Sequence, residues 1–268
     1  MNATMSGLTS SRSEHVEQVL NQVISARRIV VPESAPFEFK NCISPAQGEW
    51  LANLVTKYRP QRTLETGMGT GLSGSFFCLG LLKAAEANPN VACGRHTAID
   101  PGQTNSFWRG AGLALRDQAG LTDIFEWIGR PSEYALPQMV EANETIDLAF
   151  IDAHHRFESA LVEFYYIDRL LPKGGICIID DTDWPSVWRV VQFALQHRNY
   201  TWVDALSIDQ GPLTRPWGWN LRYRRWKQFR SQGWSGWEAL TRRPYQAVAL
   251  QKTGQDPRPE DFWSELRA

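Results

Sequence analysis

Two apolar runs of the sequence end in aspartates, a residue type that can hold a divalent cation. Asp152 ends one run, and the pair Asp180 and Asp181 ends another, 28 residues later. Carboxylates brought together repel one another, and burial raises their pKa values unless a cation compensates. Oxygen ligands favour Mg²⁺, with Ca²⁺ or Mn²⁺ as alternatives. We therefore expect a cation site here. The competing interpretation is that Asp180 and Asp181 only cap a helix that begins near Trp184.

A glycine-rich stretch has the layout of a site for a nucleotide-type cofactor. An apolar strand ends at Glu65, and Gly67, Gly69 and Gly71 follow at alternate positions before a helix that begins near Ser73. Glycines let the backbone turn sharply and approach a ligand closely. The helix N-terminus that follows offers N–H groups to a carboxylate or phosphate.

The spacing of these glycines separates two kinds of cofactor. A dinucleotide-binding turn reads Gly-x-Gly-x-x-Gly, with an acid about 20 residues further on. This chain has Gly-x-Gly-x-Gly, and its acid, Asp100, lies further away. A carboxylate at Asp100 can accept two hydroxyl hydrogen bonds, as a ribose would require.

Alternating strands and helices position these residues. Strands are predicted over Arg62–Glu65, His96–Asp100, Ile124–Ile128, Ile146–Asp152, Gly175–Asp180, Thr201–Ser207 and Ala247–Gln251. Helices are predicted over Ser73–Ala87, Asn105–Ala119, Ser132–Glu141, His155–Leu171 and Trp184–His197. The alternation predicts an α/β fold of Rossmann-like type, with a seven-stranded, mostly parallel sheet and helices on both faces. Ligands of such sheets lie beyond the carboxyl ends of the strands, where the acids fall.

The ends of the chain and one long connection complete the predicted organisation. Residues 1–42 form an extension with one helix over Glu14–Arg28, and Ser44 with Pro45 opens the helix that follows. The main domain spans 43–252, with an insertion at 208–243, and 253–268 form a tail. Connections as long as this insertion are uncommon unless functional.

Composition places the chain among ordinary soluble proteins. It is 43% hydrophobic and carries a net charge of −1. The four cysteines form no Cys-x-x-Cys pair, which favours a reduced, cytoplasmic compartment. No stretch approaches the ~20 apolar residues of a membrane span, and the N-terminus lacks the apolar run of a signal peptide.

Four segments together resemble a known family. They are Ile43–Gly48, Glu65–Ser73, Phe150–His155 and Asp180–Trp184, in that order over roughly 43–206. The chain resembles the class I S-adenosylmethionine-dependent methyltransferases. It is most similar to the metal-dependent O-methyltransferases, which include the catechol, caffeoyl-coenzyme A and macrolide-sugar enzymes.

The resemblance implies roles for individual residues. S-adenosylmethionine would be bound by Glu65, Gly67, Gly69, Gly71, Ser73, Asp100, Ser132 and Asp152, with Ser132 near the adenine and also capping its helix. Mg²⁺ or another divalent cation would be held by Asp152, Asp180 and Asp181. Asp152 and His155 would be the catalytic residues, with His155 accepting the proton of the acceptor hydroxyl. The plant and animal enzymes have a lysine at that position, so the resemblance identifies the base less firmly than the ligands. His154 is the alternative base, because the sequence does not order the two histidines.

The predicted insertion carries an unusual composition. Residues 211–243 hold five of the twelve tryptophans and eight basic residues against one acid, a net charge of +7. We interpret it as a lid or a dimer helix that shapes the acceptor pocket, with basic side chains extending along an apolar surface. Binding to nucleic-acid bases or to a membrane surface is the alternative.

These observations predict a metal-assisted O-methyltransferase that acts on a hydroxyl of a small molecule: a catechol, a vicinal diol or a sugar. A homo-oligomer is expected, and a nucleic-acid partner is not. Two alternatives remain. One is an RNA 2′-O or other nucleic-acid methyltransferase that uses the basic insertion, although Asp152–His155 lacks the Asn/Asp-Pro-Pro-Tyr motif of base methylation. The other is a non-catalytic relative that keeps the cofactor fold.

Overall fold

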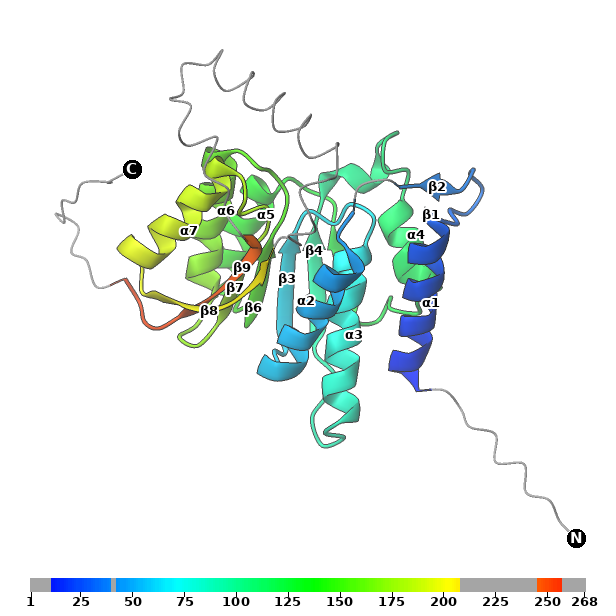
Figure 1. The fold of residues 1–268 in the computed structure, drawn as a ribbon, viewed down its shortest axis with the longest axis horizontal. Helices are drawn as coiled ribbons and strands as arrows, with labels where there is room; N and C mark the ends of the chain where they lie inside the picture. The colour runs from blue at the N-terminus through cyan, green and yellow to red at the C-terminus, as the bar shows by residue number, and fades with distance from the viewer. Residues whose placement is uncertain (1–10, 40–41, 208–244, 257–268) are drawn as a thin grey trace, which may run out of the picture. The chain divides into compact units, whose positions relative to one another are not determined.

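The seven predicted strands form one sheet (Figure 1). The structure is a computed structural model, and it describes residues 11–39, 42–207 and 245–256. The order in the sheet is β5-β4-β3-β6-β7-β9-β8. The predicted fold class is therefore confirmed. The insertion 208–243 and most of the predicted tail lie outside the described residues.

Parallel pairing brings the ends of the first strands together. β3 (Arg62–Thr66) pairs in parallel with β4 (Arg95–Ile99), which pairs in parallel with β5 (Phe125–Ile128). Thr66 lies opposite Ile99, and the Gly67 N–H donates to the Ile99 carbonyl at 2.9 Å. The turn after β3 therefore starts beside the residue that follows β4.

The chain divides into two compact units, Met1–Leu148 and Ala149–Ala268. In the first, α1 (Arg12–Ala26), β1 (Arg28–Ile29), β2 (Phe37–Glu38) and α2 (Pro45–Tyr58) precede β3. The later helical elements of this unit are α3 (Leu72–Glu86), the 3₁₀ helix η1 (Pro101–Thr104), α4 (Ala111–Gln118) and α5 (Ser132–Glu141). The ends of the predicted helices agree with these bounds within a few residues, apart from the start of α4.

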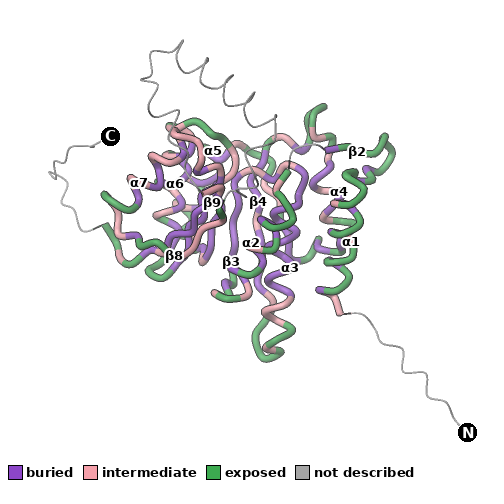
Figure 2. Tube along the Cα trace, in the orientation of Figure 1, coloured by how far each residue is buried: buried purple, intermediate pink, exposed green. Residues whose placement is uncertain are grey.

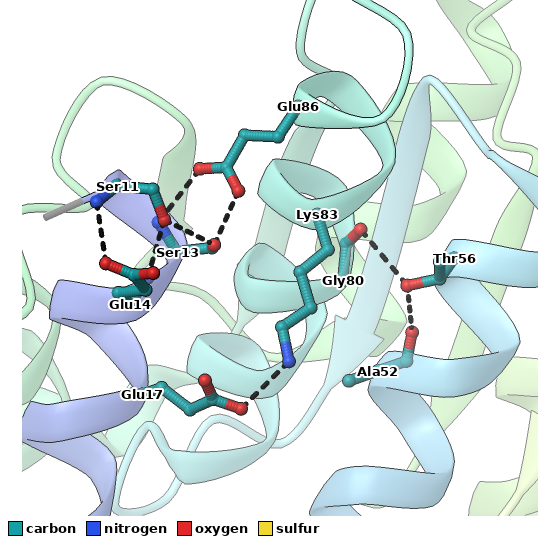
Figure 3. A network of polar contacts seen from close by, with 9 residues as sticks. All are labelled: Ser11, Ser13, Glu14, Glu17, Ala52, Thr56, Gly80, Lys83 and Glu86. Carbon is teal, nitrogen blue, oxygen red and sulfur yellow. Dashed lines mark hydrogen bonds and ion pairs between the residues drawn. The ribbon is translucent and has the colours of Figure 1, made fainter.

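Polar residues cap the start of helix α1 and join it to α3. The Ser11 side chain accepts the Glu14 N–H while the Glu14 carboxylate accepts the Ser11 N–H, which is the reciprocal capping box. The Ser13 hydroxyl and N–H donate to Glu86 of α3, and Lys83 pairs with Glu17 (Figure 3). These contacts hold the N-terminal helix on α3.

Helix α3 is buried from Leu72 to Leu82, and only its last turn is intermediate or exposed (Figure 2). Its Gly80 permits close packing against α2, since a Cβ there would lie 2.7 Å from the Ala52 carbonyl oxygen. The prediction for the start of α2 is confirmed: Ser44 is the N-cap, its side chain accepts from the Gln47 N–H at 3.1 Å, and Pro45 is the first helical residue.

The predicted helix Asn105–Ala119 is wrong in its first third. The helix begins only at Ala111. The Asn105 side chain accepts the N–H groups of Phe107 and Trp108, both at 2.9 Å, and this local turn competes with helix formation. Gly110 then adopts φ 72°, outside the right-handed helical region. Periodicity alone did not reveal this competition.

The second unit contains the remaining elements. β6 (Leu148–Ile151) begins at the boundary, and α6 (Phe157–Leu170), β7 (Ile176–Ile179) and α7 (Pro185–His197) follow. β8 (Tyr200–Ser207) and β9 (Tyr245–Lys252) close the sheet, with β9 antiparallel to both β7 and β8. Lys252 is buried, and its ammonium donates to the Leu171 carbonyl near the end of α6 at 3.0 Å. In the described ranges no helix combines the length and apolar character needed to cross a bilayer.

Candidate cofactor loop and acidic loop

The glycines after β3 form a tight loop, residues 67–71, which we call the glycine loop. Gly67, Gly69 and Gly71 all have positive φ, at 90°, 51° and 77°. Gly71 is the N-cap of α3, and a Cβ there would lie 2.8 Å from the Gly112 carbonyl oxygen. Only glycine satisfies both the backbone conformation and the close approach. The alternate glycines of the sequence are explained by this geometry.

Asp100 holds the glycine loop rather than standing apart from it. Its Oδ2 accepts the N–H groups of Met68 at 3.0 Å and Gly69 at 2.8 Å, and its Oδ1 accepts the Gly102 N–H at 2.5 Å. The side chain is buried, with 6% of its surface exposed. The prediction that Asp100 binds ribose hydroxyls remains a prediction. Its carboxylate already has these backbone donors inside the protein.

Gln103 is a residue that the sequence analysis missed. It lies in η1 and is almost fully buried. Its side-chain N–H donates to the Gly69 carbonyl at 2.8 Å, and its side-chain oxygen accepts the Gly112 N–H at 3.0 Å. The indole of Trp108 also covers Gly69, 3.4 Å from where a Cβ would lie. A glutamine three residues beyond a strand-end acid is no motif, so the sequence offered no signal.

Glu65 faces inward, under the glycine loop. Its carboxylate is fully buried, and its Oε1 lies 3.3 Å from Nε2 of His96, which is also fully buried. His96 in turn makes a hydrogen bond with the Thr63 hydroxyl at 2.9 Å and stacks on Phe77. Within the described residues neither carboxylate oxygen of Glu65 nor Nε2 of His96 has a hydrogen-bond partner, although burying a carboxylate without one is costly. Whether Glu65 also contacts a cofactor remains a prediction.

The two predicted serines lie at helix starts. Ser73 is the second residue of α3, and Ser132 is the first of α5; both are buried. The prediction that Ser132 caps its helix is wrong, because Pro131 occupies the N-cap position and no side chain caps α5. Their predicted contacts with a cofactor remain predictions.

In the second unit, three possible ligand groups converge. Donor atoms of Asp152, His155 and Asp181 all lie within 4.8 Å of one another. Nε2 of His155 is 2.7 Å from Oδ2 of Asp181. The His155 side chain is 39% exposed and that of Asp181 is 27% exposed. The predicted approach of Asp152 to the acids after β7 is therefore present for Asp181.

Asp180 differs from its neighbour. It is buried, with 6% exposed, and its N–H donates to the Ile151 carbonyl at 3.1 Å. It is not a member of the group formed by Asp152, His155 and Asp181. Asp180 follows β7 and still bonds to the end of β6, whereas Asp181 adopts a left-handed conformation, so the two adjacent carboxylates have different surroundings. The role of Asp180 as a third metal ligand remains a prediction.

The turn after β7, residues 180–184, is here called the acidic loop. Asp181 adopts φ 50°, a left-handed conformation that aspartate and asparagine tolerate better than most residues. Thr182 is fully buried, and it binds β9 twice: its N–H donates to the Gln246 carbonyl at 2.8 Å and its hydroxyl to the Tyr245 carbonyl at 2.9 Å. The loop shape is thus fixed by the strand beside it.

The surroundings of His155 distinguish it from His154. The imidazole centroid of His155 lies 5.0 Å from the ring centroid of Trp184. The backbone carbonyl of His155 accepts a hydrogen bond from the Ser186 hydroxyl at 2.7 Å. His154 is exposed and does not belong to the three-residue group. Between the two candidate bases, the geometry favours His155.

The group Asp152, His155 and Asp181 fits a divalent cation chemically. Carboxylate oxygens suit Mg²⁺, Ca²⁺ and Mn²⁺, and an imidazole nitrogen suits Zn²⁺ or Fe²⁺. Two carboxylates this close repel each other, and a cation between them would remove that repulsion. The donor set alone does not select one metal.

Comparison with known proteins finds similarity to methyltransferases. A sequence profile described as "Methyltransferase domain" matches residues 64–182. The O-methyltransferase hkm8 of Aspergillus hancockii is 29% identical over 152 residues, which cover 57% of this chain and 55% of that protein. The caffeoyl-CoA O-methyltransferase of Stellaria longipes is 28% identical over 159 residues, which cover 57% and 58%. The chain thus spans a little over half the length of these curated relatives.

A solved structure agrees with the fold. The O-methyltransferase from Bacillus cereus in complex with SAH superposes with a TM-score of 0.54 at 20% identity, covering 75% of this chain and 87% of that one. The matched profile contains both the glycine loop and the start of the acidic loop. The resemblance to class I S-adenosylmethionine-dependent O-methyltransferases that the sequence predicted is confirmed.

Proposed function

We propose that this protein is a metal-assisted O-methyltransferase acting on a small-molecule hydroxyl, since residues 64–182 match a methyltransferase-domain profile. The acceptor classes are a catechol, a vicinal diol or a sugar. The observation that carries the proposal is the convergence of Asp152, His155 and Asp181 within 4.8 Å. The glycine loop and the O-methyltransferase relatives support it.

Each loop would contribute its own chemistry. S-adenosylmethionine would supply the methyl group, and the glycine loop with the N-terminus of α3 would hold it; no side chain caps that helix end, which leaves its first N–H groups suited to a carboxylate. A divalent cation would lower the pKa of the acceptor hydroxyl and hold its oxygen. Asp152 and Asp181 would bind that cation through carboxylate oxygens, with Asp180 as the third predicted ligand.

His155 would receive the hydroxyl proton. A neutral imidazole has one N–H donor and one acceptor nitrogen. If Nε2 donates to Asp181, 2.7 Å away, then Nδ1 is the nitrogen that accepts the proton. Asp181 would orient the ring, as carboxylates do for histidine in many sites. Alignment of nucleophile and methyl group by such positioning accounts for much of the rate in displacement reactions.

Calorimetry and an acceptor panel test this function. We expect S-adenosylhomocysteine to bind the purified protein. We also expect methyl transfer from S-adenosylmethionine to at least one catechol, diol or sugar, increased by Mg²⁺ or Mn²⁺ and abolished by EDTA. Absence of cofactor binding would refute the proposal. Cofactor binding without turnover across a broad panel would favour the non-catalytic alternative.

The nucleic-acid alternative gains nothing from the described structure. It depended on residues 211–243, which lie outside the described ranges. A salt-dependent shift of RNA in a gel would revive it. Its absence at low salt would leave the small-molecule proposal as the better account.

A further inference from the structure

Gln103 makes a contact with three separate parts of the first unit. Its Nε2 donates to the Gly69 carbonyl at 2.8 Å and lies 3.3 Å from Oδ2 of Asp100. Its Oε1 accepts the Gly112 N–H at 3.0 Å. Gly112 belongs to the first turn of α4. One side chain therefore joins the glycine loop, the acid after β4 and the following helix.

The orientation of this amide is determined by its partners. The Gly112 N–H can only donate and the Gly69 carbonyl can only accept, so a flipped amide would place like groups against each other. Gln103 is 1% exposed, and water does not compete for these bonds. A buried polar group with its partners in place resists movement, because breaking its bonds leaves them unsatisfied.

The glycine loop depends on the residues outside it. Within the loop, the Gly71 N–H donates to the Met68 carbonyl at 2.8 Å. The N–H groups of Met68 and Gly69 reach Asp100, and the Gly69 carbonyl reaches Gln103. Asp100 thus holds one side of the Gly69 peptide region and Gln103 the other. Three positive-φ glycines form an intrinsically flexible segment, so these outside contacts determine its shape.

We propose that Gln103 is a positioning residue for the cofactor: it holds the glycine loop in its binding shape before the cofactor arrives. This rests on the proposed function, in which that loop binds S-adenosylmethionine. A preformed loop removes the ordering cost from binding. Loss of Gln103 should therefore weaken cofactor affinity, while turnover at saturating cofactor stays close to that of the wild type.

Hydrogen exchange on the cofactor-free protein tests directly whether Gln103 holds the glycine loop. In the wild type we expect the amides of Met68 and Gly69 to be protected. In Gln103→Leu their exchange should accelerate about 10-fold or more, as loss of about one net hydrogen bond predicts. Exchange of the β7 and β9 amides should not change. Fast exchange at Met68 and Gly69 in the wild type would overturn the proposal without any variant.

Calorimetry with S-adenosylhomocysteine supplies the second readout. Gln103→Leu should raise its Kd by about 10-fold or more and raise the KM for S-adenosylmethionine similarly, with kcat within about threefold of wild type. Gln118→Leu is the matched control: its amide also donates to a backbone carbonyl, that of Val30, but on the exposed end of α4. It should bind as the wild type does. Equal losses in the two variants would contradict a specific role for Gln103.

A second variant separates the hydrogen bond from the packing. Gln103→Met keeps the side-chain length and fills the space, but it has neither an N–H for the Gly69 carbonyl nor an oxygen for the Gly112 N–H. We expect its affinity to fall about as far as that of Gln103→Leu. Wild-type affinity in this variant would refute the proposal. Failure of the wild type to bind S-adenosylhomocysteine would instead refute the proposed function. The exchange measurement would still show whether Gln103 holds the glycine loop.

Discussion

The glycine loop and the acidic loop hold their carboxylates in opposite ways. Asp100 is buried, and backbone N–H groups of its own unit surround its oxygens. Asp181 and His155 are 27% and 39% exposed, although Thr182 fixes the backbone beside them through β9. A buried carboxylate satisfied from within maintains a shape. A half-exposed carboxylate on a fixed backbone can take a ligand from outside. The same residue type is therefore enclosed by backbone donors in one loop and open to a ligand in the other.

The largest effect is expected from removing the negative charge of Asp181 while keeping the conformation of the acidic loop. Asparagine also tolerates the left-handed backbone of Asp181, so Asp181→Asn avoids the strain that alanine would add. We expect metal-stimulated turnover to fall by about 100-fold or more, because cation coordination is worth several kcal/mol of transition-state stabilisation. Affinity for S-adenosylhomocysteine should stay within about twofold.

The control for this variant is Asp183→Asn, in the same loop but outside the group of Asp152, His155 and Asp181. It should retain most of the metal-stimulated rate. Equal loss in both variants would indicate that general loop charge matters, and that Asp181 has no particular role as a ligand.

The next effect tests whether the glycine loop is fixed by close contact. Gly71→Ala adds both a strained φ of 77° and a Cβ 2.8 Å from the Gly112 carbonyl oxygen. Gly120→Ala has a similar φ of 65° but nothing within 4 Å. We expect about 1 kcal/mol of destabilisation for Gly120→Ala, from the backbone alone. Gly71→Ala should lose about 2 kcal/mol more, from overpacking. Urea denaturation measures both, and equal losses would show that the α4 contact is unimportant.

A smaller effect tests the hydrogen bonds by which Thr182 joins the acidic loop to β9. Thr182→Val keeps the shape of the side chain but removes the hydroxyl that donates to the Tyr245 carbonyl. We expect the free energy of unfolding to fall by about 1 kcal/mol, because a part-buried hydrogen bond is lost. Mn²⁺ affinity, measured by calorimetry, should fall as well. If stability falls while Mn²⁺ affinity is unchanged, the Thr182 hydrogen bond supports the fold without positioning Asp181.

The smallest effect is a control at a residue pair outside both loops. A hydrogen bond from Arg12 holds the pKa of Asp123 below its usual value. A carboxylate with a lowered folded-state pKa contributes stability above its unfolded pKa and loses it as pH falls through the folded one. The pair is largely exposed, so Asp123→Asn should cost less than about 1 kcal/mol at pH 7. The difference from wild type should disappear in acid, and a difference that persists in thermal melts at low pH would contradict this.

The sequence predicted the strands and the acids at their ends, because both depend on local patterns. Buried apolar runs identified β6 and β7, and their position located Asp152 and Asp181. The contacts between distant residues were not predictable. Gln103 acquires its partners only when η1 and α4 fold back on the glycine loop, and Thr182 only when β9 pairs with β7. The start of α4 was missed because the side chain of Asn105 forms its own turn.

The pairing of β8 and β9 has a consequence for how this protein could diversify. Ser207 lies opposite Tyr245 in the ladder, so the chain leaves and re-enters the sheet at one paired step. The carbonyls of Tyr245 and Gln246 are the same groups that bind Thr182. Sequence between those two points can therefore be lengthened or exchanged in evolution while the anchor of Asp181 is inherited unchanged.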